Sequence, residues 1–291
     1  MKNVSYSQCN NKNEYLDILL NNYLNNKENG FYIELGANDG LCQSNSAYFE
    51  FSKNYRGILI EPSVKGYELC KINRPNSICI NCACVSNEYK EETVSGNFIN
   101  NLLMASINNT RQKEIDDILV PVTANTLENI LDNILENKKE QLDNILENKK
   151  EQLDNILENK KEQLDNILEN KKEQIDNILE NKKEQIDNIL ENTIKNVNNK
   201  KQIDFLSLDV EGYELNVLKG INLNKYRPHF LLIEIYSINY DEVVSFLMLN
   251  NYSLIINLSN YNLQDNPIWD GTHNDFLFCD NDKYCDNEKS C

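Results

Sequence analysis

The sequence of 291 residues lacks any run of eighteen or more apolar residues, so it predicts no membrane-spanning helix. The first thirty residues also lack the basic-then-apolar pattern of a secretory signal, and we therefore expect a cytoplasmic protein. Positive charge is scarce, because 29 Lys and Arg stand against 46 Asp and Glu, for a net charge of -17. This balance argues against nonspecific nucleic-acid binding, since phosphates need Lys and Arg to displace their counterions.

Histidine is rare as well, with only two residues, His229 and His273. Nine cysteines are present, but the number is odd and their spacing matches neither a zinc site nor a disulfide framework. Cys79, Cys82 and Cys84 lie in a strand-like run, so we expect reduced structural thiols rather than metal ligands. No pattern explains the cysteines of the tail, which are Cys279, Cys285 and Cys291.

The sequence does contain an alternation of short apolar runs and helical patterns. A strand starting at Phe31 enters a glycine turn at residues 36–40, and Ser44, Asn45 and Ser46 then cap a helix over 47–55. Further strands are expected at 57–61, 77–85, 203–209, 228–235, 252–257 and 274–279. Further helices are expected at 15–23, 64–73, 211–219 and 240–250, after a disordered segment 1–13. The alternation predicts an α/β fold with a doubly wound, mostly parallel sheet covered on both faces.

A repeat separates the two halves of this pattern, residues 1–125 and 201–291. The unit LDNILENKKEQ recurs from Leu131 with a period of eleven residues, about 3.67 residues per helical turn. Its Leu and Ile residues therefore stay on one narrow stripe, which predicts a coiled-coil-type helical insertion over 126–200 that offers a surface for self-association.

Geometry leaves two alternatives for this insertion. As one rod, residues 126–192 would extend roughly 100 Å, whereas the next strand starts about ten residues later, within ~35 Å. Either the insertion folds into a hairpin that turns near Asn159, or the segment 86–125 uncoils to reach a distant helix start. We favour the hairpin, because its two apolar stripes can bury each other.

The glycine turn carries the first chemical signal. Its pattern, Glu34-x-Gly36-x-x-x-Gly40, lacks the third glycine of the dinucleotide fingerprint and places an acid inside the strand. This acid would repel a pyrophosphate, whereas the ammonium group of S-adenosylmethionine could donate a hydrogen bond to it. Glu61 ends the next strand about twenty residues later, where an acid commonly accepts hydrogen bonds from both ribose hydroxyls. Together these residues favour S-adenosylmethionine over NAD.

Acids also follow two later strands. Asp209 and Glu211 lie at the carboxyl edge of the predicted sheet, where open α/β sheets bind their ligands. Glu234 lies at the same edge, embedded in FLLIEI, where a carboxylate is costly unless it is paired or used. Asp209 and Glu211 could hold a divalent ion, but no metal cluster can be argued from the sequence.

The motifs together resemble the FkbM family of S-adenosylmethionine-dependent methyltransferases. The segments that carry the resemblance are ELGANDG, SNSAYFE, LIEPS, INRPNSICINCAC, DFLSLDVEGYELNVLKG and RPHFLLIEI, in the family's order. The resemblance implies a class I, Rossmann-like sheet of seven strands with the last antiparallel, and usually O-methylation of a sugar or another small hydroxyl-bearing substrate. The insertion is a departure, since family members have a short T-L-x-x-I-L helix where this chain has residues 126–131.

The resemblance also implies a site. The residues that would hold the methionine end of the cofactor are Glu34, Gly36, Ala37, Asn38 and Gly40. Those implied at the ribose are Glu61 and Pro62, and those beside the methyl group are Asp209, Glu211 and Gly212. A sulfonium is already a good leaving group, so the enzyme mainly aligns the nucleophile with the methyl group. A hydroxyl acceptor must still lose its proton, and the first candidate for this role is Asp209, followed by Glu211 and His273.

Two rival hypotheses belong to other functional classes. One is a catalytically silent methyltransferase-like domain that anchors a coiled-coil interaction arm. The other is an enzyme on a similar sheet that binds a nucleotide sugar or a nicotinamide. The identity of the small-molecule methyl acceptor is not indicated by any pattern in residues 87–111.

Overall fold

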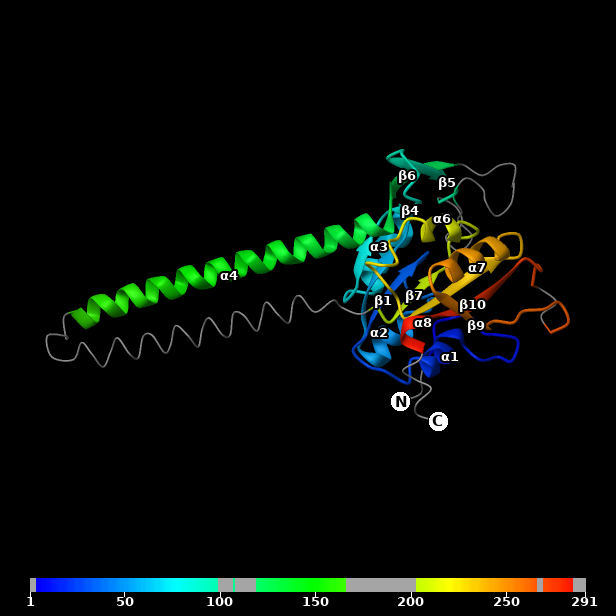
Figure 1. Cartoon of the computed structure of the whole chain (residues 1–291), viewed down its shortest axis with the longest axis horizontal. Coiled ribbons are helices and arrows are strands. Elements are labelled where there is room, and N and C mark those ends of the chain that lie inside the picture. Colours follow the sequence, from blue (N-terminus) through cyan, green and yellow to red (C-terminus); the bar gives the residue numbers. More distant parts are fainter. Residues whose placement is uncertain (1–3, 99–106, 108–118, 166–202, 266–268, 285–291) are drawn as a thin grey trace. The chain divides into compact units, whose positions relative to one another are not determined.

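The computed structural model describes residues 4–98, 107, 119–165, 203–265 and 269–284 (Figure 1). The chain divides into two compact units, one of Met1–Ile130 with Gln202–Cys291 and the other of Leu131–Lys201. The first unit contains the sheets and the candidate site.

Seven strands form the main sheet, in the order β3-β2-β1-β7-β8-β10-β9. Their bounds are β1 Phe31–Leu35, β2 Arg56–Ile60, β3 Ile78–Ile80, β7 Phe205–Leu208, β8 Phe230–Tyr236, β9 Tyr252–Asn257 and β10 His273–Asp280. The pairs from β3 to β8 are parallel, whereas β10 is antiparallel to both β8 and β9. The predicted seven-stranded, mostly parallel sheet with an antiparallel last strand is confirmed.

Helices cover both faces of this sheet. Their bounds are α1 Leu16–Tyr23, α2 Ala47–Lys53, α3 Val64–Asn73, α6 Glu214–Leu218, α7 Tyr240–Leu249 and α8 Asn281–Tyr284. All seven residues of β8 are buried, although alternate side chains of a strand point to opposite faces. Both faces are therefore excluded from solvent, as the doubly wound prediction requires.

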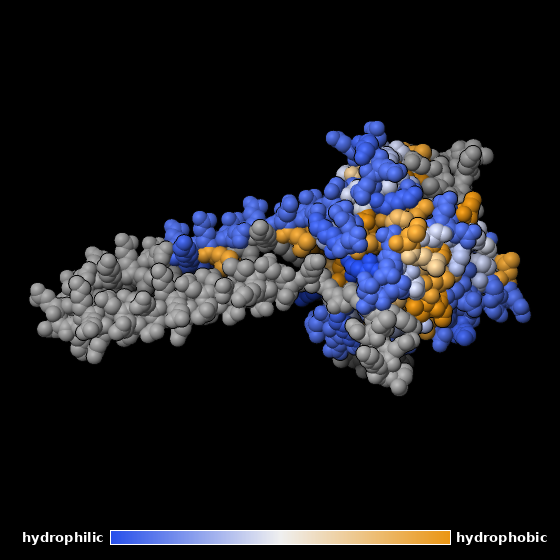
Figure 2. Space-filling model, viewed as in Figure 1, coloured by the Kyte–Doolittle hydropathy of each residue, from blue (hydrophilic) through white to orange (hydrophobic). Residues whose placement is uncertain are grey.

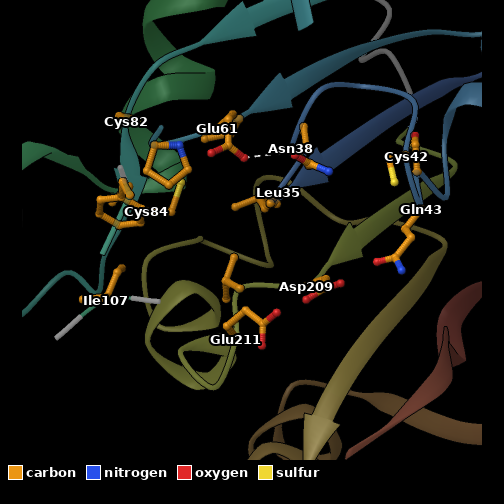
Figure 3. A pocket seen from close by; sticks show the side chains of 18 residues that line it. Leu35, Asn38, Cys42, Gln43, Glu61, Cys82, Cys84, Ile107, Asp209 and Glu211 are labelled. Atoms are coloured by element: carbon orange, nitrogen blue, oxygen red, sulfur yellow. Dashed lines mark hydrogen bonds between the residues drawn. The ribbon is translucent and has the colours of Figure 1, made fainter. Parts of the chain in front are cut away.

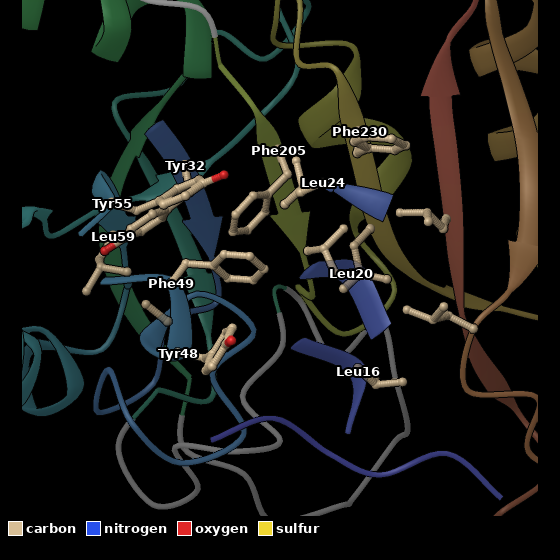
Figure 4. Packing of buried hydrophobic residues seen from close by; sticks show 14 of the residues in the cluster. Leu16, Leu20, Leu24, Tyr32, Tyr48, Phe49, Tyr55, Leu59, Phe205 and Phe230 are labelled. Carbon is tan, nitrogen blue, oxygen red and sulfur yellow. The ribbon is translucent and has the colours of Figure 1, made fainter. Parts of the chain in front are cut away.

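An aromatic cluster forms the core on one face (Figure 4). Phe49 of α2 packs against Phe205 of β7 with ring centroids 4.8 Å apart, and Tyr32 of β1 stacks on Phe205 at 5.9 Å. Leu16 and Leu20, spaced four residues apart on α1, close the same cluster. The core thus fixes β1 and β7 side by side, and these are the strands whose carboxyl ends carry the candidate site.

The prediction of one strand over 77–85 was wrong. The segment forms two strands, since β3 pairs with β2 in the main sheet while β4 (Ala83–Cys84) pairs with β6 (Val120–Asn125) in a second sheet. The third member of that sheet is β5 (Thr93–Gly96), which like β6 was not predicted. At the break, the side-chain amide of Asn81 donates to the carbonyl oxygens of Glu61 and Pro62, at 2.8 and 2.9 Å, where the chain leaves the main sheet.

Two further expectations need correction. Residues 4–13 are packed rather than disordered, because Ser5 Oγ donates to Asp17 Oδ1 at 2.6 Å and Tyr6 N donates to Asp17 Oδ2 at 3.0 Å. The helix expected from position 211 starts only at Glu214, because Glu211 and Gly212 have left-handed φ values of 57° and 92°. Residues 1–3 lie outside the described residues.

Helix α4 (Leu127–Asp165) contains the first copies of the repeat in 39 residues. Thr126 Oγ1 accepts a hydrogen bond from Asn129 N at 3.2 Å, which satisfies one free N–H group of the first turn. The helix continues through Asn159, so a turn at that residue is excluded. The later copies lie outside the described residues, and the hairpin stays a prediction.

The apolar stripe of α4 is visible as orange side chains among blue ones (Figure 2). Two of its members, Leu135 and Ile145, are 53% and 52% exposed. Among the described residues, no helix is both long and apolar enough to cross a membrane, α4 included.

Candidate functional site

The carboxyl ends of β1 and β7 meet at a glycine. Gly36 has a φ of +77°, and a Cβ added to it would lie only 1.8 Å from the carbonyl oxygen of Asp209. Any other residue would push these two strand ends apart. The strand order also reverses here, since β2 and β3 follow on one side of β1 while β7 and β8 follow on the other. Open α/β sheets bind ligands at such a switch point.

Backbone N–H groups of the turn donate hydrogen bonds to other groups of the protein. Gly36 N and Ala37 N donate to the Ile60 carbonyl at 3.0 and 3.3 Å, and Gly40 N donates to the Ala37 carbonyl at 2.7 Å. Asn38 N donates to Glu61 Oε2 at 2.8 Å. Helix α2 does not start until Ala47. These N–H groups therefore stabilise the turn itself.

Glu34 lies behind the turn and does not line the cavity described below. Its carboxylate accepts hydrogen bonds from Ser44 Oγ at 2.9 Å, Asn45 N at 2.8 Å and Ser46 Oγ at 2.6 Å. These bonds hold the segment that leads into α2. Binding of the cofactor ammonium by Glu34 stays a prediction, and the structure gives this carboxylate a full set of other donors.

Arg74, at the end of α3, is fully buried and holds the far end of the turn. Its Nε donates to Glu50 Oε2 at 2.8 Å and its Nη1 donates to the Gly40 carbonyl at 2.8 Å. Gly40 also lacks room for a side chain, since a Cβ would lie 2.9 Å from Arg74 Cγ. Gly40 therefore shapes the turn without lining the cavity. Sequence reasoning did not assign a role to Arg74, although it lies inside the INRPNSICINCAC segment.

Four segments, together with Phe98 and Ile107, line one cavity at the switch point (Figure 3). The four segments are the turn after β1, the end of β2, the region of β4 and the loop after β7. Glu61 lies on one side of the cavity in Figure 3, and Asp209 and Glu211 lie on another. The lining residues are Leu35, Gly36, Ala37, Asn38, Cys42, Gln43, Ser44, Ile60, Glu61, Pro62, Cys82, Ala83, Cys84, Phe98, Ile107, Asp209, Val210 and Glu211.

Glu61 is buried at the end of β2 with acceptor capacity to spare. Its Oε1 accepts from Ser63 N and its Oε2 from Asn38 N, both at 2.8 Å. A carboxylate offers about four lone-pair sites, so roughly two remain for a ligand in the cavity. Burial raises the pKa of Glu61 to about 7, although both N–H bonds act in the opposite direction.

Three carboxylates converge beyond the end of β7. One oxygen each of Asp209, Glu211 and Glu234 lies within 4.8 Å of the others. The Tyr236 hydroxyl donates to Glu211 Oε2 at 2.6 Å and so fixes that side chain. Glu214 stabilises the backbone before α6, because its Oε1 accepts from Gly212 N at 2.9 Å and from Val210 N at 3.3 Å.

The carboxyl groups in and around this cluster have raised pKa values. Burial raises the pKa of Asp209 and of Glu234 well above their usual range, and repulsion from neighbouring carboxylates adds to the effect. Burial also raises the pKa of Glu214 to about 7 and that of Asp275 to about 6. Carboxyl groups with raised pKa values hold a proton more readily than exposed ones do, and such groups cluster at functional sites.

His273 lies behind this cluster rather than in the cavity. Its Nε2 is 3.4 Å from Glu234 Oε1, and its Nδ1 is 3.4 Å from Asp270 Oδ1. The ring also lies edge-on to Trp269, with centroids 6.4 Å apart. His273 thus does not line the cavity, but it contacts Glu234 and, with ring centroids 5.4 Å apart, Tyr236.

The structure thus brings together most of the residues predicted for the site. Those that line the cavity are Gly36, Ala37, Asn38, Glu61, Pro62, Asp209 and Glu211, and those outside it are Glu34, Gly40, Gly212 and His273. Sequence reasoning missed the wall formed by Cys82, Ala83 and Cys84, since it treated this run as part of a strand of the main sheet. It also missed the contact between Tyr236 and Glu211, for which the sequence holds no signal.

Comparison with known proteins agrees with this geometry. Residues 34–254 match the family model described as the methyltransferase FkbM domain, a match that covers more than half of the chain. No curated protein matches the chain. The matched range starts at Glu34 in β1 and extends into β9, so it includes every residue that lines the cavity. The chain therefore belongs to the FkbM methyltransferase family.

Proposed function

We propose that this protein is an S-adenosylmethionine-dependent methyltransferase that methylates a hydroxyl group of a sugar or another small substrate. One observation carries the proposal: the turn after β1, Glu61 after β2, and Asp209 and Glu211 after β7 line a single cavity. Family membership supports the transfer of a methyl group, and the predicted cofactor and acceptor class follow the same family.

The residues present suit the cofactor. The spare acceptor sites of Glu61 fit the two ribose hydroxyls, which are hydrogen-bond donors. The wall of Ile60, Ala83 and Ile107 offers apolar surface to a planar adenine. When bound, S-adenosylmethionine supplies an electrophilic methyl group on a positively charged sulfur. The carboxylate of Asp209 at the other end of the cavity favours that positive charge.

Asp209 is also the residue that we assign to the acceptor hydroxyl. It is half-buried, lines the cavity and has a raised pKa, so it can hold a hydroxyl and accept its proton. Glu211, fixed by Tyr236, lines the same end and helps to position the acceptor. His273 contributes by holding Glu234 and does not touch the cavity.

The test is a calorimetric titration of the full chain with S-adenosylmethionine, S-adenosylhomocysteine and NAD. We expect both adenosyl compounds to bind and NAD not to bind. Glu61→Gln should weaken binding roughly 10- to 100-fold, because it removes charge-assisted hydrogen bonds. The matched control is Glu68→Gln, an exposed position on the helix that Ser63 caps, which should bind as the wild type does. Binding of NAD alone would overturn the proposal.

A screen of hydroxyl-bearing compounds by mass spectrometry then identifies the acceptor by the gain of one methyl group. A second candidate function is that of a silent domain that anchors an interaction arm. The observation that favours it is the exposure of Leu135 and Ile145 on α4. A folded chain that binds no adenosyl compound, yet self-associates in sedimentation experiments, would favour that candidate.

A further inference from the structure

The carboxylate cluster beyond β7 brings three acidic side chains close together. Asp209, Glu211 and Glu234 place one oxygen each within 4.8 Å of one another. Glu211 is 8% exposed and Glu234 is 7% exposed, so water screens their repulsion poorly. Buried carboxylates are normally paired, neutral or bound to a metal.

Glu234 provides an independent observation. Its Oε1 faces His273 Nε2 at 3.4 Å. Its Oε2 is buried and receives no hydrogen bond from any residue that the structure describes. A buried polar atom without a partner is rare in native proteins, and a bound ion would supply the contact that this oxygen needs.

We propose that Asp209, Glu211 and Glu234 together bind a divalent cation of the oxygen-preferring class, such as Mg²⁺ or Mn²⁺. Hard cations of this kind take carboxylate oxygens as ligands, and Mg²⁺ keeps several of its waters when proteins bind it. Three carboxylate oxygens fill half of an octahedral shell, so about three positions stay open. His273 holds Glu234 from behind, which is the usual place of an outer residue that orients a metal ligand.

The location of the cluster gives the ion a role, which rests on the proposed function. Asp209 and Glu211 line the cavity, so an ion held by them would lie beside the space proposed for the acceptor. Hydroxyl oxygens can replace waters on such an ion, and binding to it lowers their pKa. Two adjacent open positions would select acceptors with two neighbouring oxygen atoms, for example a vicinal diol of a sugar.

The competing occupant of the cluster is a proton. The carboxyl groups of Asp209 and Glu234 are close enough to share a hydrogen bond when one of them is protonated. A shared proton would also reduce the repulsion, without any metal. The experiment must therefore separate the binding of a cation from the binding of a proton.

The full chain, freed of metal with a chelator, is titrated with Mn²⁺, and the free ion is followed by its electron paramagnetic resonance signal. We expect saturation at one Mn²⁺ per chain. Glu234→Gln should weaken binding roughly tenfold or more, since it removes a ligand. The matched control is Glu242→Gln, an exposed position on α7, and should leave binding unchanged.

Melting temperatures give a second readout. Without metal, Glu234→Gln should melt higher than the wild type, because it removes one of the repelling charges. With Mn²⁺ the order should reverse, which a purely structural role of Glu234 would not produce. If Glu234→Gln does not fold, Asp209→Asn at the half-buried cavity wall serves as the ligand variant.

Absence of saturable Mn²⁺ binding, or equal binding by Glu234→Gln and Glu242→Gln, would overturn the proposal in favour of a shared proton. Mn²⁺ is titrated without cofactor or acceptor, so the outcome is independent of the proposed function. If the chain binds Mn²⁺ but no adenosyl compound, the cation site stands and the methyltransferase proposal is refuted. If it binds an adenosyl compound but no Mn²⁺, the cation site is refuted and the methyltransferase proposal stands.

Discussion

The buried pair of Arg74 and Glu50 allows a quantitative prediction about the turn that shapes the cavity. The side chain of Arg74 is 0% exposed and that of Glu50 is 2% exposed, with 2.8 Å between Nε and Oε2. Burial alone would raise the pKa of Glu50, but the charge of Arg74 and hydrogen bonds from Ser77, Tyr32 and Arg74 together lower it. Glu50 is therefore ionised in the folded protein, and its stability contribution is lost only as the pH falls into the acid range.

Arg74→Met removes the positive charge and leaves that of Glu50 buried. Breaking a buried pair in this way costs roughly 3–5 kcal/mol of unfolding free energy. For a domain of this size the melting temperature should fall by roughly 6–20 °C, which differential scanning calorimetry measures directly. The same change removes the donor to the Gly40 carbonyl, so the turn should loosen and S-adenosylmethionine should bind more weakly.

Two further variants test the reasoning. Lys71→Met breaks the exposed pair of Lys71 and Glu68 on the same helix and should leave the melting temperature nearly unchanged. The double variant Arg74→Met with Glu50→Gln removes both buried charges and should recover part of the loss, because no unpaired charge remains. A loss of less than about 1 kcal/mol for Arg74→Met would contradict a buried, ionised pair. So would a loss in the double variant equal to the sum of the losses in Arg74→Met and Glu50→Gln.

Three other changes act on the cavity itself. Gly36→Ala places a Cβ 1.8 Å from the Asp209 carbonyl, so melting should show a loss well above about 2 kcal/mol, and near-normal stability would contradict the geometry. Gly66→Ala improves helix propensity by about 1 kcal/mol, yet its Cβ would lie 2.7 Å from Asn38 O and 2.8 Å from Glu61 Cγ. Calorimetry should therefore show weaker cofactor binding and a lower melting temperature, and unchanged affinity would refute this. Because burial raises the pKa of Glu61 to about 7, its stability contribution is complete below about 4.5 and is lost as the pH rises through about 7. The unfolding free energy, measured in urea at several pH values, should fall with rising pH by up to about 3 kcal/mol more in the wild type than in Glu61→Gln. Parallel plots of unfolding free energy against pH for the two proteins would argue against this effect.

The local part of the fold could be predicted from the sequence. Helix α3 and strand β9 have the predicted bounds, because glycine, proline and asparagine mark their ends within a few residues. The second sheet could not be predicted, since Ala83 of β4 pairs with Ala124 of β6, far away in the chain. Its strands are short, and Pro121 within β6 weakens the pattern that identifies a strand.

The candidate site likewise contains residues that could be predicted from the sequence and residues that could not. Gly36 and Asp209 could be assigned because each directly follows an apolar run, and the carboxyl ends of parallel strands share one edge. The partners of Glu34 could not, since an acid in a strand shows no preference between a ligand and the hydroxyl groups of Ser44 and Ser46. Glu234 was recognised as a costly acid, but its approach to Asp209 follows from the pairing of β7 with β8 and from the loop conformation after β7.

The uninterrupted helix α4 has a consequence for how this gene can vary. Eleven residues make three helical turns with an excess of only about 20°, so each added or lost copy of the repeat shifts the apolar stripe by that small angle. Copies gained or lost by slippage during DNA replication would change the helix in steps of about 16 Å. None of the residues that line the cavity lies within the repeat. Length variants of this protein can therefore arise without any substitution at the residues proposed to perform methyl transfer.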